Sequence, residues 1–247
     1  TVSMKAIKAA GELILKGGKY SLDSADDTIH SNANITISDG EFTLASGDDG
    51  IHADSATTIS GGTIDITESY EGIEGLSIDI TGGETYVSGP TNDGNSALDY
   101  NGTGTVTGGI FIAAGSSGMA ENFGDSSTQG VMMVTVNSQA AGSAVSLSDS
   151  SGNELVSWTP EKEYTSVIIS CPEITTGQEY TLTTGSDTTQ ITMDSIVYGS
   201  GSGMGGNPGN GGGPGNGGDM GQKPDDGNGT GKGSGDGGNM GTPPEKS

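Results

Sequence analysis

Small aliphatic residues alternate with polar residues through roughly the first 120 positions, in short runs such as Ile35-Thr-Ile37. Alternation with a period of two is typical of β-strands, and no 3.6-residue apolar pattern of useful length interrupts it. Asn, Asp and Gly residues separate the runs and indicate turns. The pattern therefore predicts an all-β segment made of many short strands.

The runs recur with a period of 22 residues, apart from one step of 21. Three strands with tight turns in each period describe one coil of a parallel β-helix, in which each coil pairs with the next. We predict a right-handed parallel β-helix whose inward positions form aliphatic ladders. A narrow stacked core needs few large side chains, which agrees with an aromatic content of 4%. The two predicted ladders are Ile7, Ile29, Ile51, Ile73 and Leu15, Ile37, Ile59, Ile80.

The chain divides into three segments by composition. Residues 1–130 hold the predicted β-helix. Residues 131–198 hold short β-branched runs separated by turn signals, which predict a small antiparallel β-sheet or sandwich that caps it. Residues 199–247 contain no Val, Ile, Leu, Phe, Tyr or Trp. Such a segment buries too little apolar area to offset its ordering entropy, so we expect a disordered Gly-rich tail.

Charge narrows the possible functions. The net charge of -24 argues against nucleic acid and anionic membrane as direct partners, because both carry the same sign. No apolar run is long enough to insert into a membrane. All eight basic residues are lysines, so no guanidinium group can clamp a phosphate or carboxylate. A single cysteine excludes an internal disulfide and a cysteine-based zinc site.

Acidic residues recur in the turn before the first ladder, in one coil after another. Equivalent positions of adjacent coils lie roughly 4.8 Å apart, and two carboxylates at that distance repel by about 1 to 3 kcal/mol. Calcium, with oxygen ligands at roughly 2.3 to 2.6 Å, fits between two coils better than the smaller magnesium ion. We therefore expect bound Ca²⁺, with a solvated, Asx-capped turn as the alternative. The predicted metal ligands are Asp26, Asp27, Asp48, Asp49, Glu71, Glu74 and Asp93.

A second column lies beside the acidic turns. It reads Lys8, His30, His52 and Glu74 at successive offsets of 22, and so changes from cationic to imidazole to anionic. Two histidines with carboxylates also suit zinc, which leaves a transition metal as an alternative to calcium. Neutral stacked histidines without a metal are the commoner state.

Five strings stand out between residues 5 and 195. They are Asp26-Asp-Thr-Ile-His-Ser-Asn32, Ser46-Gly-Asp-Asp-Gly-Ile-His-Ala-Asp54, Ser69-Tyr-Glu-Gly-Ile-Glu-Gly75, Asn95-Ser-Ala-Leu-Asp-Tyr100 and Ala113-Ala-Gly-Ser-Ser-Gly-Met-Ala120. In combination they resemble a bacterial family of surface carbohydrate-binding domains. The resemblance implies a calcium-containing right-handed parallel β-helix, related in fold to polysaccharide lyases. It also implies binding of polygalacturonate and cellulose without demonstrated cleavage. The coils between the third and fourth strings look shorter here than in that family. The calcium ligands that the resemblance implies are Asp26, Asp27, Asp48, Asp49 and Glu71.

A non-catalytic polysaccharide-binding protein is the function that these features favour. The expected ligand is an acidic plant cell-wall glycan such as polygalacturonate (pectin), or cellulose. A calcium ion with an open coordination position would bridge the acidic protein and a uronate. We expect a monomer at the bacterial surface or outside the cell. A structural adhesin without a sugar ligand and a calcium-dependent lyase are the alternatives. A lyase needs a lysine or arginine base, and it is disfavoured because the chain has no arginine and the lysines of the repeat all lie in its first coil. The predicted ligand-binding residues are Tyr70, Tyr100, His30, His52, Lys5 and Lys8.

Overall fold

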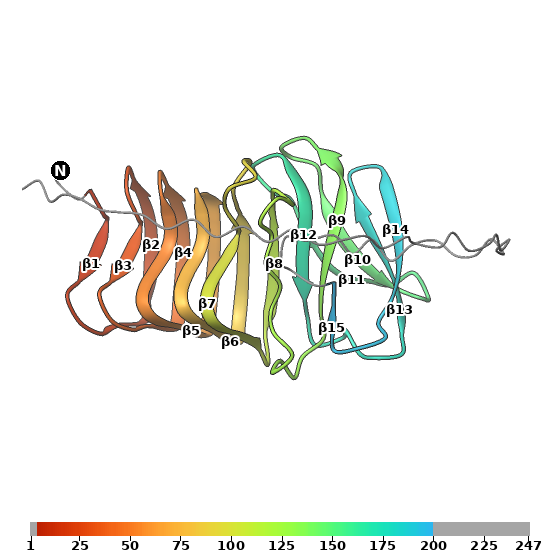
Figure 1. Ribbon diagram of the computed structural model, residues 1–247, viewed down its shortest axis with the longest axis horizontal. Helices are drawn as coiled ribbons and strands as arrows, with labels where there is room; N and C mark the ends of the chain where they lie inside the picture. The colour runs from red at the N-terminus through yellow and green to blue at the C-terminus, as the bar shows by residue number, and fades with distance from the viewer. Residues whose placement is uncertain (1–3, 200–247) are drawn as a thin grey trace, which may run out of the picture. The chain divides into compact units, whose positions relative to one another are not determined.

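The computed structural model of the protein describes residues 4–199, and every regular element in this range is a β-strand (Figure 1). The segment predicted to be a disordered tail lies outside the described residues, apart from Gly199. Within residues 4–199, no helix has the length and apolar character needed to cross a membrane.

The first eight strands stack as the coils of a parallel β-helix, which confirms the predicted fold class. Parallel pairing places Ile7 beside Ile29, Ile29 beside Ile51 and Ile51 beside Ile73, each at the predicted offset of 22. The second predicted ladder is confirmed in the same way. The strands are β1 (Ile7–Ala9), β2 (Leu13–Ser24), β3 (Ile29–Ser31), β4 (Ile35–Ser46), β5 (Asp49–Glu68), β6 (Glu71–Ser88), β7 (Leu98–Val106) and β8 (Ile110–Gly115).

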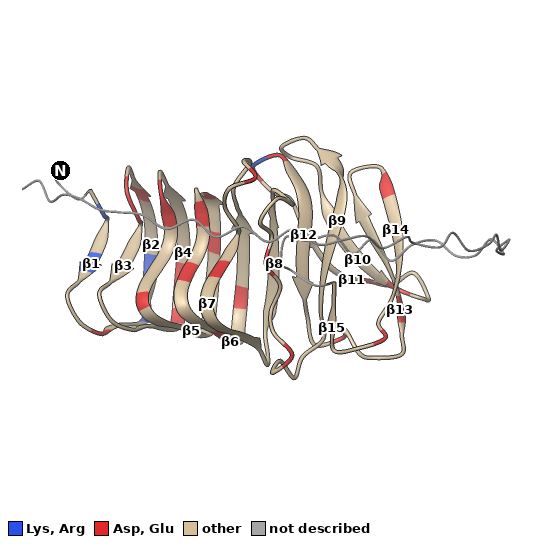
Figure 2. Cartoon of the chain, in the orientation of Figure 1, with Lys and Arg blue, Asp and Glu red and all other residues tan. Residues whose placement is uncertain are grey.

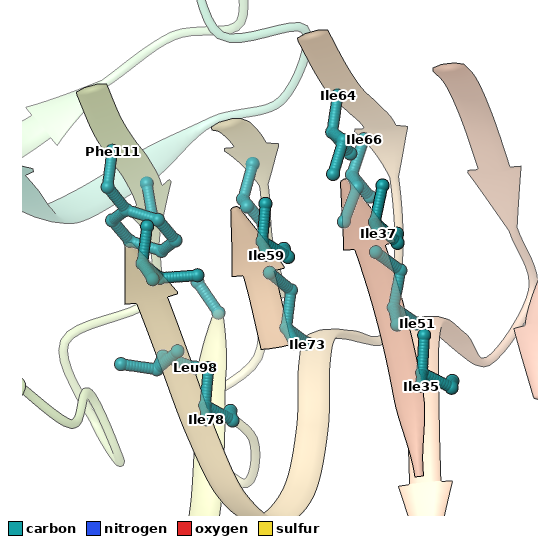
Figure 3. Close-up of a cluster of buried hydrophobic side chains, with 14 of the residues drawn as sticks. Ile35, Ile37, Ile51, Ile59, Ile64, Ile66, Ile73, Ile78, Leu98 and Phe111 are labelled. Carbon is teal, nitrogen blue, oxygen red and sulfur yellow. The ribbon is translucent and has the colours of Figure 1, made fainter. Parts of the chain in front are cut away.

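The core of the β-helix is a stack of aliphatic side chains (Figure 3). Ile29, Ile51 and Ile73 are fully buried, one above another in adjacent coils. The space between the sheets of the β-helix is narrow and is filled by these aliphatic side chains. Aromatic rings lie mainly toward the two ends of the β-helix. Tyr20 stacks on Phe42 with ring centroids 4.8 Å apart, and Phe111 meets Phe123 edge to face at 5.0 Å.

Glycine is required between the acidic turns and the first ladder. A Cβ on Gly50 would lie 2.7 Å from the carbonyl oxygen of Gly72, and one on Gly72 would collide with the carbonyl oxygen of Ala97. The Gly-Ile pairs that follow Asp49 and Glu71 are therefore dictated by the close approach of one coil to the next, whereas Thr28 occupies the equivalent position after Asp27. This approach fixes the acidic residue relative to the buried ladder.

The remaining described strands form the C-terminal part of the structure. Strand β12 pairs with β8 antiparallel, and β9 and β15 extend the same sheet. A separate antiparallel sheet has the order β11-β10-β13-β14. The strands are β9 (Val131–Gln139), β10 (Val145–Asp149), β11 (Glu154–Trp158), β12 (Tyr164–Ser170), β13 (Glu179–Thr184), β14 (Asp187–Thr192) and β15 (Val197–Tyr198).

Strand β8 is the wall between two hydrophobic cores. Phe111 and Ala113 face the core of the β-helix, whereas Ile112 and Ala114 belong to a second cluster. That cluster lies between the sheet of β8, β12 and β9 and the four-stranded sheet, and it includes the fully buried Cys171. The C-terminal part therefore has the two-sheet arrangement of a small sandwich. Strand β12 hydrogen bonds directly to β8, so one sheet continues across residue 130. A domain boundary at that residue stays a prediction.

Candidate functional site

Acidic side chains lie on the edge of the β-helix where each coil enters the first ladder. Asp49 begins β5 and Glu71 begins β6, and parallel pairing sets them side by side. Asp27 lies one coil earlier, where the amide of the next residue donates to the carbonyl oxygen of Asp49 at 3.0 Å. Figure 2 shows acidic segments on one coil after another. The predicted stacking of these three residues is thus present.

The lower end of this column contains Asp26, Asp27 and Asp48. One carboxylate oxygen from each lies within 4.8 Å of the others. Lys5 of the first coil donates to Asp26 at 2.9 Å and also to Asp27. The hydrogen bond from Lys5 lowers the pKa of Asp26 to about 2 against the opposing effect of burial. Lys5 therefore neutralises part of this cluster.

Asp27 is the most deeply buried member of the acidic column, with 1% of its surface exposed. Its Oδ2 atom accepts hydrogen bonds from Lys5 and from Nδ1 of His30. Its Oδ1 atom is buried and has no hydrogen-bond partner among residues 4–199. A buried carboxylate oxygen without a donor is costly, so this atom indicates a place for a cation.

Higher in the column, the carboxylates have no lysine partner in the described part of the chain. Burial, followed by the charge of Asp49, raises the pKa of Glu71 to about 7. Burial is also the main cause that raises the pKa of Asp49 to about 7. For Asp48 the pKa is raised by burial and then by the charges of Asp27 and Asp26. Burial and the neighbouring negative charges therefore favour the protonated forms of these groups.

The histidine column follows the predicted register. Lys8 pairs with His30, His30 with His52, and His52 with Glu74. Nδ1 of His52 lies 2.9 Å from Oδ2 of Asp49 and 2.8 Å from Oε2 of Glu74. The hydrogen bond to Asp49 raises the pKa of His52 against the effect of burial. Glu74 therefore joins the acidic cluster through His52, while Lys8 is an exposed register neighbour of His30.

Asp93 does not follow the predicted 22-residue register of the acidic column, while its role as a metal ligand stays a prediction. Between β6 and β7 the offset grows from 22 to 25 residues, because Ile73 pairs with Leu98. The extra residues enlarge the turn before β7, and there Asp93 accepts a hydrogen bond from Ser116. At the new offset Asp99, instead of Asp93, extends a column by pairing with Glu74.

The two predicted sugar-stacking tyrosines differ in environment. Tyr70 is 50% exposed in the turn before β6. Tyr100 is half-buried, its hydroxyl donates to the carbonyl oxygen of Asn122 at 2.6 Å, and burial raises its pKa to about 12. Tyr70 therefore presents a free ring to solvent, whereas Tyr100 is held against the structure.

Tyr100 lines a cavity of about 460 Å³ that the sequence did not predict. Its charged lining residues are Asp99 and Glu121, and the pKa of each is raised mainly by burial. The exposed Met119 also lines it. Because β7 pairs with β6, this cavity continues the edge that carries the acidic and histidine columns.

Two further residues escaped the sequence interpretation. Asp54 lies near both histidines, at 3.6 Å from Nε2 of His52. Its position two residues after His52 on one strand was a usable signal, since such residues share a face. Lys162, from the loop before β12, donates to the carbonyl oxygen of Ser69 at 2.7 Å, and burial lowers its pKa. Nothing in the repeat predicts that contact, which spans 93 residues.

Comparison with known proteins gives one match. Residues 1–50 match a family model described as "Carbohydrate-binding domain-containing protein". Searches of curated proteins and of solved structures returned no match. The matched stretch contains Asp26, Asp27, Asp48 and Asp49, and over it the chain is similar to a carbohydrate-binding domain.

Proposed function

We propose that the protein binds polysaccharide without cleaving it, through calcium held on the acidic column. The observation that carries the proposal is a coincidence of two independent features. The stretch similar to a carbohydrate-binding domain ends at residue 50, and it contains the four aspartates of the two lowest acidic turns. The same turns hold the buried, unpartnered Oδ1 atom of Asp27.

Calcium suits this donor set. The cluster of Asp26, Asp27 and Asp48 offers only carboxylate oxygens, which are the ligands that hard cations prefer. An ion with ligands at roughly 2.3 to 2.6 Å accommodates oxygens up to about 5 Å apart, and the cluster lies within 4.8 Å. Asp49 and Glu71, in the adjacent turns, would add negative charge. Lys5 already neutralises Asp26 and Asp27 from below, so we expect the ion on the side of Asp48.

Bound calcium would also explain how so acidic a chain retains a sugar polymer. A net charge of -24 repels polygalacturonate unless a cation lies between the two. Calcium commonly has 6–8 ligands, more than three carboxylates supply if each binds through one oxygen, so a uronate carboxylate can complete the shell. The exposed ring of Tyr70 would offer a stacking surface beside it. Cellulose, which is neutral, would depend on that surface and on the cavity beside Tyr100.

Lysine chemistry supports binding over cleavage. A lyase needs a free base next to the calcium-bound uronate. Lys5 is the lysine in contact with the acidic cluster. Against the opposing effect of burial, the hydrogen bonds that its ammonium donates to Asp27 and Asp26 raise its pKa and disfavour the neutral form. Lys162 donates to a backbone carbonyl oxygen.

The proposal also places the protein at the cell surface or outside the cell, where polymeric glycans and millimolar calcium occur.

Native gels containing polygalacturonate or hydroxyethylcellulose test the proposal. On polygalacturonate we expect retarded migration in calcium and normal migration in EDTA. The double variant Asp26→Asn/Asp48→Asn should lose this retardation, while Asp39→Asn, which neutralises an exposed residue of β4 away from the column, should keep it. Equal retardation on polygalacturonate in calcium and EDTA would refute the calcium bridge. Normal migration on both polymers in calcium would refute polysaccharide binding and favour a structural spacer.

A further inference from the structure

The two histidines of the chain lie in adjacent coils with their rings in contact. Their ring centroids are 4.8 Å apart and the planes are inclined by 60°. In each ring Nδ1 faces the carboxylate three residues earlier, at 2.8 Å for His30 with Asp27 and 2.9 Å for His52 with Asp49. A neutral histidine that donates from Nδ1 has a lone pair on Nε2. In that neutral form each Nε2 atom can act as a metal ligand.

The two Nε2 atoms converge on one oxygen atom. Oδ1 of Asp54 lies 4.0 Å from Nε2 of His30 and 3.6 Å from Nε2 of His52. The other oxygen, Oδ2, accepts a hydrogen bond from the side-chain amide of Asn32 at 3.1 Å, which orients the carboxylate. Asn32 and Asp54 are themselves 22 residues apart, so the repeat that stacks the histidines also stacks this pair.

We propose that His30, His52 and Asp54 form a zinc site, separate from the calcium ligands of the acidic column. Tetrahedral zinc with ligands at about 2.0 to 2.2 Å separates its ligand atoms by about 3.3 to 3.6 Å. The measured distances of 3.6 and 4.0 Å are at or slightly above this range. The three ligand atoms do not all lie within 4.8 Å of one another, so binding one ion requires both imidazole rings to turn toward each other.

The surroundings favour zinc over calcium at these atoms. Imidazole nitrogen is a preferred ligand of zinc and copper, whereas calcium takes oxygen. A metal-bound histidine usually donates its other N–H to a carboxylate, and Asp27 and Asp49 provide that arrangement here. His30 is almost buried, but the side chain of Asp54 is 45% exposed, so an ion can enter from solvent and retain a water as fourth ligand.

Zinc titration of the untagged, metal-free protein tests the site. We expect one Zn²⁺ per chain by isothermal titration calorimetry, and a tetrahedral visible spectrum when Co²⁺ replaces it. The chain has 2 histidines, so a nitrogen-ligated spectrum reports on this pair alone. His30→Gln and His52→Gln should each weaken zinc affinity at least about tenfold. Asp54→Asn, a change at an exposed carboxylate, should weaken it by about tenfold, and Asp23→Asn, an exposed control, should leave it unchanged.

Three results would overturn the proposal. One is the absence of stoichiometric zinc binding by folded wild-type protein. Another is unchanged affinity in either histidine variant. The third is unchanged affinity in Asp54→Asn. That result would show that Asp54 is not a zinc ligand, even if the histidines bind the ion. Circular dichroism of each variant in EDTA establishes whether it is folded. If a histidine variant does not fold, the zinc affinity of Asp54→Asn tests the proposed ligands instead. The calcium-site variant Asp26→Asn/Asp48→Asn should keep its zinc affinity, since neither residue touches an imidazole.

Discussion

Replacing Ile51 with alanine tests whether the stacked ladder carries the stability of the β-helix. Ile51 is fully buried and pairs with Ile29 in the coil before it and Ile73 in the coil after it. Figure 3 shows Ile51 and Ile73 in the core. The change removes three carbon groups, worth about 2.4 kcal/mol at about 0.8 kcal/mol each. The coils on either side are held by parallel pairing, so the cavity cannot collapse and its own cost adds to this. We expect a total loss of about 3 to 4 kcal/mol, within the range of about 2–5 kcal/mol for such changes.

Urea unfolding followed by circular dichroism measures this loss. Ile14→Ala is the matched control, because Ile14 lies in β2 but is 45% exposed. Its effect should stay within about 0.5 kcal/mol. In a thermal scan, Ile51→Ala should unfold roughly 10 °C below the wild type, since about 1 kcal/mol corresponds to 2–4 °C for a chain of this size. A loss below about 1 kcal/mol, or one equal to that of the control, would refute the stacked-core argument.

Three further predictions concern the acidic edge. Gly72→Ala should lower the unfolding free energy by more than about 2 kcal/mol in urea titrations, because its Cβ would collide with the backbone of the next coil; an unchanged midpoint would contradict the close approach. In EDTA the protein should melt at a higher temperature at pH 5 than at pH 8. The folded-state pKa values of Asp49 and Glu71, raised to about 7, give stability that is present below the unfolded values of about 4 and is lost as the pH rises through 7. Calcium should reduce this difference, and a higher melting temperature at pH 8 in EDTA would contradict the sign. Lys5→Gln should lower the melting temperature in EDTA but tighten calcium binding by calorimetry, because the ammonium competes with the ion; weaker binding would count against competition.

The regular part of the fold was predictable because each coil repeats the chemistry of the previous one. A close backbone approach demands glycine, a narrow core demands small aliphatics, and both recur every 22 residues, so the ladder through Ile51 could be read directly. The acidic and histidine columns follow from the same register, which is why Asp49, Glu71 and His52 were placed correctly relative to one another.

The repeat could not predict what happens where it breaks. The longer turn before β7 shifts the offset to 25, which removes Asp93 from the acidic column and adds Asp99 to the histidine column after Glu74. Long-range contacts are equally hidden, as with Lys162, which contacts the turn of Ser69 from the loop before β12. Asp54 was missed for another reason: its contacts with the histidines follow from strand alternation within a coil, and not from a column of like charges across coils.

Calorimetric titration of an oligogalacturonate into the protein, in calcium and then in EDTA, tests the central claim most directly. The account predicts binding in calcium that disappears in EDTA and returns when calcium is restored. Binding of equal affinity in both buffers would contradict a calcium-mediated polysaccharide site on the acidic column. So would the absence of binding in calcium, together with no retardation in polygalacturonate gels.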